Sequence, residues 1–255
     1  MSPLEIILFI ILGALLGWLG GLFGIGGGLI AISILGIAFG MDQQHAQGTS
    51  LVMVVPTVLI GLYHYWRRGG MDARVIALMA LTAGAMTYFF ARLAVALPST
   101  PLRRAFAVFL IVLALYYAWR GYSETRGGES RKSVKPMLPW PFTGLIGLTG
   151  GALSGLFTVG GAVFSVPALT LLFGYAQTVA QGMGLALVLP SLLFGLVVYG
   201  GAGDIRWPVG LALAAGSVLT VSWGVSLAHR LPEAALKYGF SVVLLLTAGL
   251  LWLRA

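Results

Sequence analysis

The sequence predicts an all-α polytopic membrane protein that contains two similar halves. Hydrophobic residues make up 59% of the 255 positions and charged residues 9%, whereas soluble domains carry about 25% charged residues. No charged side chain occurs from Met137 to Gly203, and Asp42 is the only one between Ile6 and Trp66. Both tracts are much longer than the roughly 20 residues of one membrane crossing, so each must cross the bilayer more than once.

Five helical segments are predicted in the first half, from the apolar runs that lie between charged and turn residues. They are Leu4–Gly20, a short Gly27–Phe39, Ala46–Trp66, Val75–Leu97 and Leu102–Arg120. A polar stretch from Gly121 to Lys135 follows them. We interpret this stretch as an exposed linker between the two halves.

The second half predicts the same order of segments. They are Phe142–Phe157, a short Gly160–Phe173, Val179–Tyr199, Pro208–His229 and Ala235–Leu253. We therefore expect roughly 8–10 membrane segments. They are divided into a first membrane repeat (1–121), a cytoplasmic linker (122–139) and a second membrane repeat (140–255).

An internal match supports this division. A shift of 134 positions places Leu22–Gly69 over Leu156–Gly203 without a gap, so that LFGIGGGLI lies over LFTVGGAVF and FGMDQQHAQG over FGYAQTVAQG. The matched pairs include Pro56 with Pro190, Gln43 with Gln177, Gln47 with Gln181 and Tyr65 with Tyr199. Shared apolar composition does not align prolines and glutamines, so we interpret the chain as an internal duplication.

The arginine and lysine positions predict that the two repeats are inverted relative to each other. Basic residues concentrate in cytoplasmic loops, which places both the basic linker and the Arg67-Arg68 loop in the cytoplasm. The first half then starts outside and the second half inside. Arg103 and Arg104 fall outside in this topology and argue against it. Inverted repeats are a recurrent plan of secondary transporters, which bind substrate where the repeats meet.

Two glycine-rich interruptions are the first candidate site. Gly26, Gly27 and Gly28 interrupt one apolar run, and Gly160 and Gly161 interrupt the matching run. Each precedes a segment of about 14 residues, which is short for a full crossing and indicates broken or re-entrant helices. The first N–H groups of such helices lack partners and, with the helix dipole, favour an anion. We expect one anion between the two breaks; the alternative is that the glycines only allow close helix packing.

Polar residues that follow the short segments are the second candidate site. Gln47, Thr49 and Ser50 fall in the first turns of a predicted span, where polar side chains are costly unless they have a partner or face a cavity. Gln181 occupies the matching Ala-Gln-Gly frame of the second half. Two amides can donate to an oxyanion without adding charge, with the two hydroxyls assisting in one half. The alternative is hydrogen bonding between helices, worth about 1 kcal/mol or less.

Catalytic and cofactor motifs are not found in the sequence. It has no cysteine, no His-Glu-x-x-His motif and no nucleophile elbow, so we expect neither an enzyme nor a cofactor or metal. Asp42 and Asp204 are the only acids near the repeated core, and neither has an evident partner. His45 and His64 are candidate proton carriers, but both lie near span ends, where an interfacial position without a role is the simpler interpretation.

The sequence resembles the TauE/SafE family of sulfite exporters in several motifs. These are GLFGIGGGLI, the following HAQGTSL, the Arg67-Arg68-Gly69 loop and, in the second half, GLFTVGGAVFSVPAL. The resemblance covers nearly the whole chain and implies an inner-membrane transporter of sulfite, thiosulfate, sulfoacetate or related organosulfonates. The chain departs from the family pattern at Gly182-Met183-Gly184, where the family usually repeats Gly-Thr-Ser, and its paired glutamines replace residues that are commonly aliphatic. These departures put a simple transfer of another member's substrate in doubt.

The residues and the resemblance together predict a secondary transporter, with export as the family's usual direction, that moves a small sulfur oxyanion by alternating access. The bacterial inner membrane is the expected location. The formal charge of +8 is explained by basic loops, so we expect the lipid bilayer and no nucleic acid as a partner. A passive anion channel and a non-transporting membrane protein stay open as alternatives. The sequence does not decide between a monomer and a homodimer.

Overall fold

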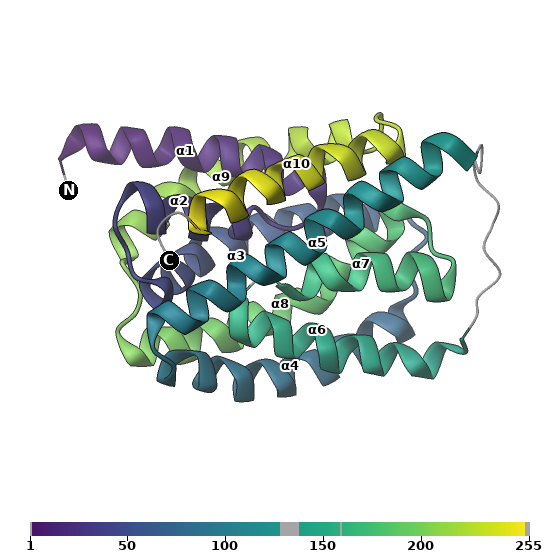
Figure 1. Ribbon diagram of the computed structural model, residues 1–255, viewed down its shortest axis with the longest axis horizontal. Coiled ribbons are helices and arrows are strands. Elements are labelled where there is room, and N and C mark those ends of the chain that lie inside the picture. The colour runs from purple at the N-terminus through teal and green to yellow at the C-terminus, as the bar shows by residue number, and fades with distance from the viewer. Residues whose placement is uncertain (1, 128–137, 159, 253–255) are drawn as a thin grey trace.

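The computed structural model describes residues 2–127, 138–158 and 160–252, and every regular element in these ranges is helical (Figure 1). The first half contains α1 (Pro3–Phe23), α2 (Gly28–Ala38), α3 (Gln43–Arg67), α4 (Ala73–Ala96) and α5 (Ser99–Gly127). The second half contains a 3-10 turn, η1 (Trp140–Phe142), and the helices α6 (Thr143–Phe157), α7 (Gly160–Phe173), α8 (Gln177–Ala202), α9 (Trp207–Ala228) and α10 (Glu233–Trp252). The predicted all-helical fold is confirmed.

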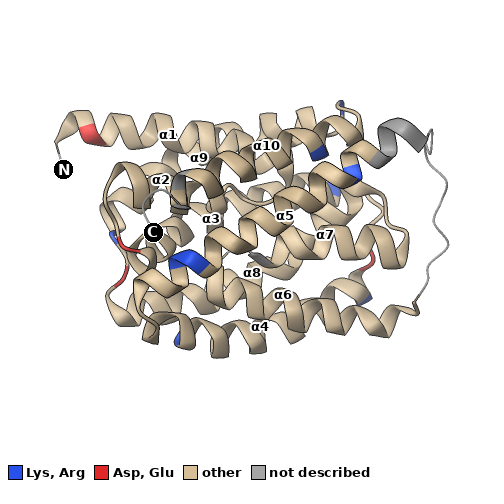
Figure 2. Cartoon of the chain, viewed as in Figure 1, with Lys and Arg blue, Asp and Glu red and all other residues tan. Residues whose placement is uncertain are grey.

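Six of the described helices are long and apolar enough to cross a membrane, namely α1, α3, α4, α5, α8 and α9. Shorter apolar segments lie in α2, α7 and α10. Leu81, Phe89 and Trp223 are each at least 70% exposed, as expected for side chains that face lipid. Lysine, arginine and acidic residues lie mainly toward the two ends of the bundle (Figure 2). The chain is therefore a multi-pass membrane protein.

The linker between the halves begins later than the sequence indicates. We placed the end of the fifth segment at Arg120, whereas α5 continues to Gly127. The remainder of the predicted polar stretch, residues 128–137, lies outside the described residues.

Several helix boundaries repeat with the spacing of the internal sequence match. α3 and α8 begin at residues 43 and 177, α4 and α9 at 73 and 207, and α5 and α10 at 99 and 233, so that each pair differs by 134. α1 and α6 end at residues 23 and 157, which again differ by 134. Helices thus start or stop at matching positions in the two halves, although the capping residues differ: the Asp42 side chain caps α3, whereas Ala176 precedes α8 without a side-chain cap.

The first helix of each half packs against a helix of the other half. α1 lies beside α9, and α6 lies beside α4 (Figure 1). A Cβ atom added at Gly17 would lie 2.4 Å from the Cα and carbonyl oxygen of Ser217, and one added at Gly151 would lie 2.4 Å from the carbonyl oxygen of Ala83. Because no side chain fits in such a space, the backbones touch directly, as small residues allow in membrane helices. The two halves are therefore interleaved.

The two central helices, α3 and α8, run antiparallel. Gln47 near the start of α3 contacts Tyr199 near the end of α8. Tyr65 near the end of α3 contacts Gln181 near the start of α8. The matching residues of the two halves therefore lie at opposite ends of this helix pair.

Candidate functional site

The predicted break in the first half is present and depends on glycine. α1 ends at Phe23, and the chain then passes through left-handed backbone at Gly24, Gly26 and Gly27, with φ angles of 68°, 69° and 77°. The N–H groups of Ile25 and Gly26 both donate to the carbonyl oxygen of Gly20, at 3.1 and 3.3 Å. Only glycine adopts such backbone without strain, so the glycine run stops one helix and allows α2 to begin at Gly28.

The second break places a strained residue where the first has Gly24. Thr158 has a φ of 62°, and a β-branched residue in left-handed backbone costs about 1–3 kcal/mol. α7 begins at Gly160, and the N–H of Gly161 donates to the Ser154 hydroxyl at 3.1 Å. We expected unpaired N–H groups at this helix start, but one of them already has a side-chain partner. Strain of this kind persists where the surrounding structure enforces it, often at functional sites.

Gln181 of the second half lies against the break of the first half. Its Nε2 donates to the carbonyl oxygen of Phe23 at 3.2 Å, at the end of α1. Its Oε1 accepts from the Tyr65 hydroxyl at 3.1 Å. A Cβ atom at Gly24 would meet the Cβ and Cγ atoms of Gln181 at 2.8 and 2.9 Å. The amide thus joins the end of α1 to the end of α3, and its residue is only 2% exposed.

Gln47 of the first half makes the corresponding contacts with the second half. Its Nε2 donates to the carbonyl oxygen of Leu156 at 3.1 Å, near the end of α6. Its Oε1 accepts from the Tyr199 hydroxyl at 2.6 Å. Each glutamine therefore connects a helix end and a tyrosine that both belong to the other half. The alternative interpretation, hydrogen bonding between helices, is thus observed at both glutamines.

The structure does not bring the two glutamines to each other. Gln181 contacts Tyr65, which follows Gln47 by 18 residues on α3, and 18 helical residues span about 27 Å. Neither a glutamine nor a tyrosine side chain is long enough to close that separation. In this conformation, one small anion cannot contact both amides. The predicted site is divided into two, each formed by one break and the glutamine of the other half.

The hydroxyl groups of Thr49 and Ser50 form hydrogen bonds with nearby backbone groups. The Thr49 hydroxyl accepts from the N–H of Arg206 at 3.0 Å, in the connection before α9. The Ser50 hydroxyl donates to the carbonyl oxygen of Gln47 at 2.8 Å, within the same helix. Both residues are fully buried. Thr49 therefore fixes the α8–α9 loop, while Ser50 extends the hydrogen bonding of the Gln47 turn.

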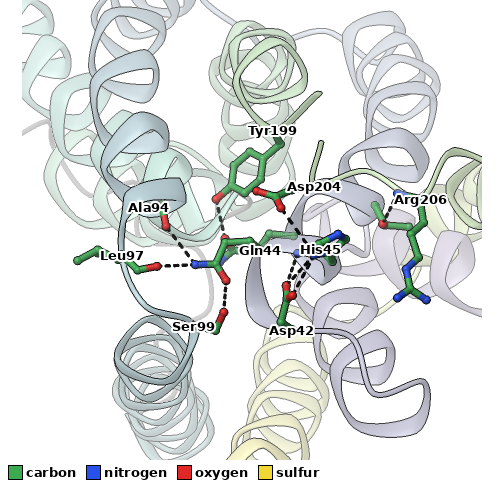
Figure 3. A network of polar contacts seen from close by, with 11 residues as sticks. Asp42, Gln44, His45, Ala94, Leu97, Ser99, Tyr199, Asp204 and Arg206 are labelled. Atoms are coloured by element: carbon green, nitrogen blue, oxygen red, sulfur yellow. Dashed lines mark hydrogen bonds and ion pairs between the residues drawn. The ribbon is translucent and has the colours of Figure 1, made fainter. Parts of the chain in front are cut away.

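Our expectation that Asp42 and Asp204 have no evident partner is wrong. Figure 3 shows His45 between the two carboxylates: its Nδ1 lies 3.0 Å from an oxygen of Asp42 and 3.6 Å from an oxygen of Asp204. Burial raises the pKa of the Asp204 carboxyl, His45 lowers it and Asp42 raises it. Asp204 comes from the α8–α9 loop, so no local spacing revealed its contact with His45, whereas Asp42 lies only three residues before His45 at the start of α3.

Gln44 ties the same end of the bundle together (Figure 3). Its Nε2 donates to the carbonyl oxygens of Leu97 at 2.7 Å and Ala94 at 3.4 Å, and its Oε1 accepts from the Ser99 hydroxyl. The amide thereby links the start of α3 to the α4–α5 connection. At a different place, His64 Nε2 lies 2.9 Å from the Ser222 hydroxyl, so this histidine binds α9.

Three residues that lie next to the glutamines, Tyr65, Tyr199 and Lys237, were not among the predicted site residues. Tyr65 and Tyr199 are 3% and 0% exposed, and their alignment in the internal match is the signal that could have found them. Lys237, which is 5% exposed, lines a small cavity together with Gln181. It lies 134 positions after Arg103, so an extension of the match beyond Gly203 would have pointed to it.

A comparison with models of protein families shows the family to which the chain belongs. The family model described as "Sulfite exporter TauE/SafE" matches residues 9–251. The chain belongs to the TauE/SafE family. The resemblance inferred from the glycine motifs is thus confirmed, and it covers both halves.

Curated relatives of this TauE/SafE protein are named as probable membrane transporter proteins. One from Methanocaldococcus jannaschii is 27% identical over 254 residues, which cover 93% of this chain and 91% of the relative. One from Haemophilus influenzae is 26% identical over 275 residues, with 98% of each chain covered. One from Bacillus subtilis is 24% identical over 234 residues, with 92% and 93% covered. The matches extend over nearly the full length of these proteins, so the sequence similarity includes both halves of the chain.

Proposed function

We propose that this TauE/SafE protein is a secondary transporter that exports small sulfur-containing anions, such as sulfite, thiosulfate or sulfoacetate. The observation that carries the proposal is the crossed arrangement of Gln181 at the first break and Gln47 at the second. An amide nitrogen has two N–H groups, so each glutamine can hold a helix end and donate to an anion. Neutral donors stabilise an anion without adding a charge that would trap it. The family description as sulfite exporters supports the substrate class.

We infer further that the two halves are inverted repeats and that transport occurs by alternating access. The constant spacing of 134 between helix boundaries supports this inference, as do the glycine contacts that recur between α1 and α9 and between α6 and α4. A rocking motion of one group of helices against the rest exposes one break and then the other. The anion is then held in turn at the two glycine-rich breaks, with Gly26–Gly28 at one and Gly160–Gly161 at the other.

The bacterial inner membrane is the proposed location. Lipid is the expected neighbour of the exposed apolar side chains on the outside of the bundle. The proposal requires one chain, and a homodimer of such chains is compatible with it.

Flux through reconstituted protein tests the function. We expect proteoliposomes to move sulfite, thiosulfate or sulfoacetate with saturable kinetics and to discriminate against chloride and sulfate. Labelled substrate should enter faster when unlabelled substrate is present inside, because a carrier returns more quickly when loaded. Flux without such counterflow and with a high unitary current would instead identify a passive anion channel. Empty and protein-containing vesicles with equal flux of every anion would identify a non-transporting protein.

Cysteine labelling tests the inverted orientation. Gly69 and Gly203 are matched positions in the sequence, and a Cβ atom at either meets nothing within 4 Å. A side chain in the left-handed backbone of these exposed positions costs about 1–2 kcal/mol. Because the chain has no cysteine, Gly69→Cys and Gly203→Cys each introduce one thiol. An impermeant maleimide should label the two variants from opposite sides of the membrane. Labelling of both from the same side would contradict the inversion.

A further inference from the structure

The α8–α9 loop lies directly on the start of α3. The carbonyl oxygen of Asp204 is so close to this helix that a Cβ atom at Gly48 would meet it at 2.2 Å. The N–H of Arg206 donates to the Thr49 hydroxyl at 3.0 Å. The carboxylate of Asp204 lies 3.6 Å from Nδ1 of His45. The loop therefore closes over the first turns of α3, which carry one of the two buried glutamines.

The matching contact at the other end of the bundle contains no charged group. At the spacing of 134, the residues that match Asp42, His45 and Asp204 are Ala176, Val179 and Gly70. A Cβ atom at Gly70, in the α3–α4 loop, would lie 3.1 Å from Cγ2 of Val179 at the start of α8. The contact between a loop and a helix start is thus repeated in the two halves, but only one copy of it contains groups that titrate.

One proton decides whether the carboxylates and the imidazole of this cluster attract each other. A neutral imidazole that carries its proton on Nδ1 can still donate to the carboxylate of Asp42, which lies 3.0 Å away. Attraction of the Asp204 carboxylate at 3.6 Å requires a charged ring. Without that charge, two carboxylates face each other across His45 and repel. Groups this close titrate as a unit, so the proton belongs to the cluster as a whole.

Proton binding favours the closed position of the loop. In this position the pKa of the Asp204 carboxyl lies above its ordinary value, chiefly because of burial, while His45 opposes the shift and Asp42 adds to it. Release of the loop would return the carboxyl to water and weaken its hold on the proton. The state that binds the proton more tightly is favoured as pH falls, so low pH favours closure and rising pH favours release. The side chains of Asp42 and His45 are 48% and 34% exposed, so the cluster exchanges protons with the solution at its own end.

The surroundings of the cluster leave its proton to these three residues. In the described part of the chain, the ion pairs of the two carboxylates are with His45. Glu5 accepts from the N–H of Ser2, the Tyr199 hydroxyl donates to Gln47, and α2 has no titratable residue. Figure 3 shows the Arg206 side chain beside the two carboxylates and not between them. The other titratable side chains near the start of α5, which packs against α3, are Arg103 and Arg104.

The histidines at the other end contact α9 and not a loop. Nε2 of His64 lies 2.9 Å from the Ser222 hydroxyl, and Nδ1 of His229 lies 2.8 Å from the carbonyl oxygen of Val225. The α3–α4 loop therefore has no counterpart of the contact between His45 and the α8–α9 loop among the described residues.

We propose that Asp42, His45 and Asp204 form a pH-sensitive latch, which holds the α8–α9 loop on α3 while its proton is bound and releases the loop when the proton is lost. The inference rests on the proposed alternating access, in which each end of the bundle opens in turn. Because the matching contact contains no titratable group, the latch responds to pH on one side of the membrane only. It therefore gives a transporter built from two similar halves a difference between its two sides.

Thiol accessibility in the purified chain measures the latch without any substrate. Ile205 lies in the α8–α9 loop, is 9% exposed and has its Cγ1 3.2 Å from a Cβ atom placed at Gly48. Its match in the α3–α4 loop is Met71, whose Sδ lies 2.7 Å from a Cβ atom placed at Gly182. Because the chain has no cysteine, Ile205→Cys and Met71→Cys each introduce one thiol, and the second is the matched control. Maleimide labelling rates are measured from about pH 6 to pH 8, where histidine changes charge, and divided by the rate of the unfolded chain to correct for thiol ionisation.

The corrected rate of Ile205→Cys should rise at least about fivefold over this range, since an equilibrium linked to one proton changes by up to about tenfold per pH unit. Met71→Cys should not follow pH. Adding His45→Gln to Ile205→Cys removes the cation and should leave the thiol accessible throughout. Adding Asp204→Asn, which is uncharged like the protonated acid, should keep the thiol protected throughout. A purely structural role of both residues would instead expose the thiol in both variants.

A corrected Ile205→Cys rate that does not depend on pH would overturn the latch, as would an equal increase at Met71→Cys. If the His45→Gln variant does not fold, Asp204→Asn decides alone, because a pH response that persists there has the same meaning. A pH-dependent thiol at position 205 in a protein without flux would refute transport and keep the latch. Flux in a protein whose thiol is indifferent to pH would keep transport and refute the latch.

Discussion

Replacing Gly17 with leucine is expected to prevent the chain from reaching its folded state. The new Cβ would lie 2.4 Å from the Cα and carbonyl oxygen of Ser217, so α1 and α9 would have to separate. Overpacking against movable side chains costs about 1–3 kcal/mol, and backbone atoms of a long helix cannot turn aside. We therefore expect a loss of at least about 3 kcal/mol, a large share of a typical total stability. Size-exclusion chromatography in detergent should show aggregate in place of the monodisperse peak.

Two further variants give this prediction its controls. Gly151→Leu places the same clash between α6 and α4, because its Cβ would lie 2.4 Å from the carbonyl oxygen of Ala83. It should aggregate in the same way. Gly201→Leu adds the same side chain to α8 at a position where a Cβ meets nothing within 4 Å. A monodisperse Gly17→Leu variant with unchanged thermal stability would show that α1 does not pack on α9 as described.

Gln47→Leu is expected to reduce transport at least about tenfold and to lower stability by about 1–3 kcal/mol. Leucine has a similar size but cannot accept from the Tyr199 hydroxyl or donate to the carbonyl oxygen of Leu156. A buried polar group left without its partner accounts for the stability loss. The transport loss follows from the donor that the anion no longer meets, at 1.4 kcal/mol for each factor of ten. Initial rates of sulfite flux and thermal unfolding in detergent measure the two effects.

A double variant separates the structural role of Gln47 from its role toward the anion. Gln47→Leu with Tyr199→Phe removes the amide and the hydroxyl together, so that the phenol no longer lacks a partner. Much of the stability should return, whereas transport should stay low. Recovery of transport together with stability would mean that the glutamine only joins helices, and Tyr199→Phe alone reports the contribution of the hydroxyl.

The fold was largely predictable because the signals that determine it are local. Long uncharged tracts identify the spans, and the glycine runs identify the breaks. Pro56 and Pro190, like the paired glutamines, show the repetition at a fixed distance. The tracts and the glycine runs are contiguous in the chain, the repetition is visible by comparing the sequence with itself, and hydrophobic length converts directly into membrane crossings. The end of α5 was missed because charged residues are as compatible with a helix outside the membrane as with a loop.

The arrangement of the candidate site was less predictable because it depends on contacts between halves. Gln47 and Gln181 were expected either to have hydrogen-bond partners or to face a cavity, and both have partners. The single site between them required a distance that no sequence pattern contains. Tyr65 lies near the end of a predicted span, where interfacial aromatic residues are common, and only the contact with Gln181 reveals its buried role. Lys237 lies beyond the matched segment and carries no motif of its own.

The crossed packing of α1 on α9 and α6 on α4 has a consequence for how the protein is assembled. A fragment that ends between the halves would leave α1 without its packing surface, and the complementary fragment would leave α6 without its own. Two such fragments would have to enter the bilayer in opposite orientations, in equal amounts, and then meet by lateral diffusion. The covalent tether removes all three requirements, because it fixes the stoichiometry at one to one and holds each half at a high effective concentration near the other.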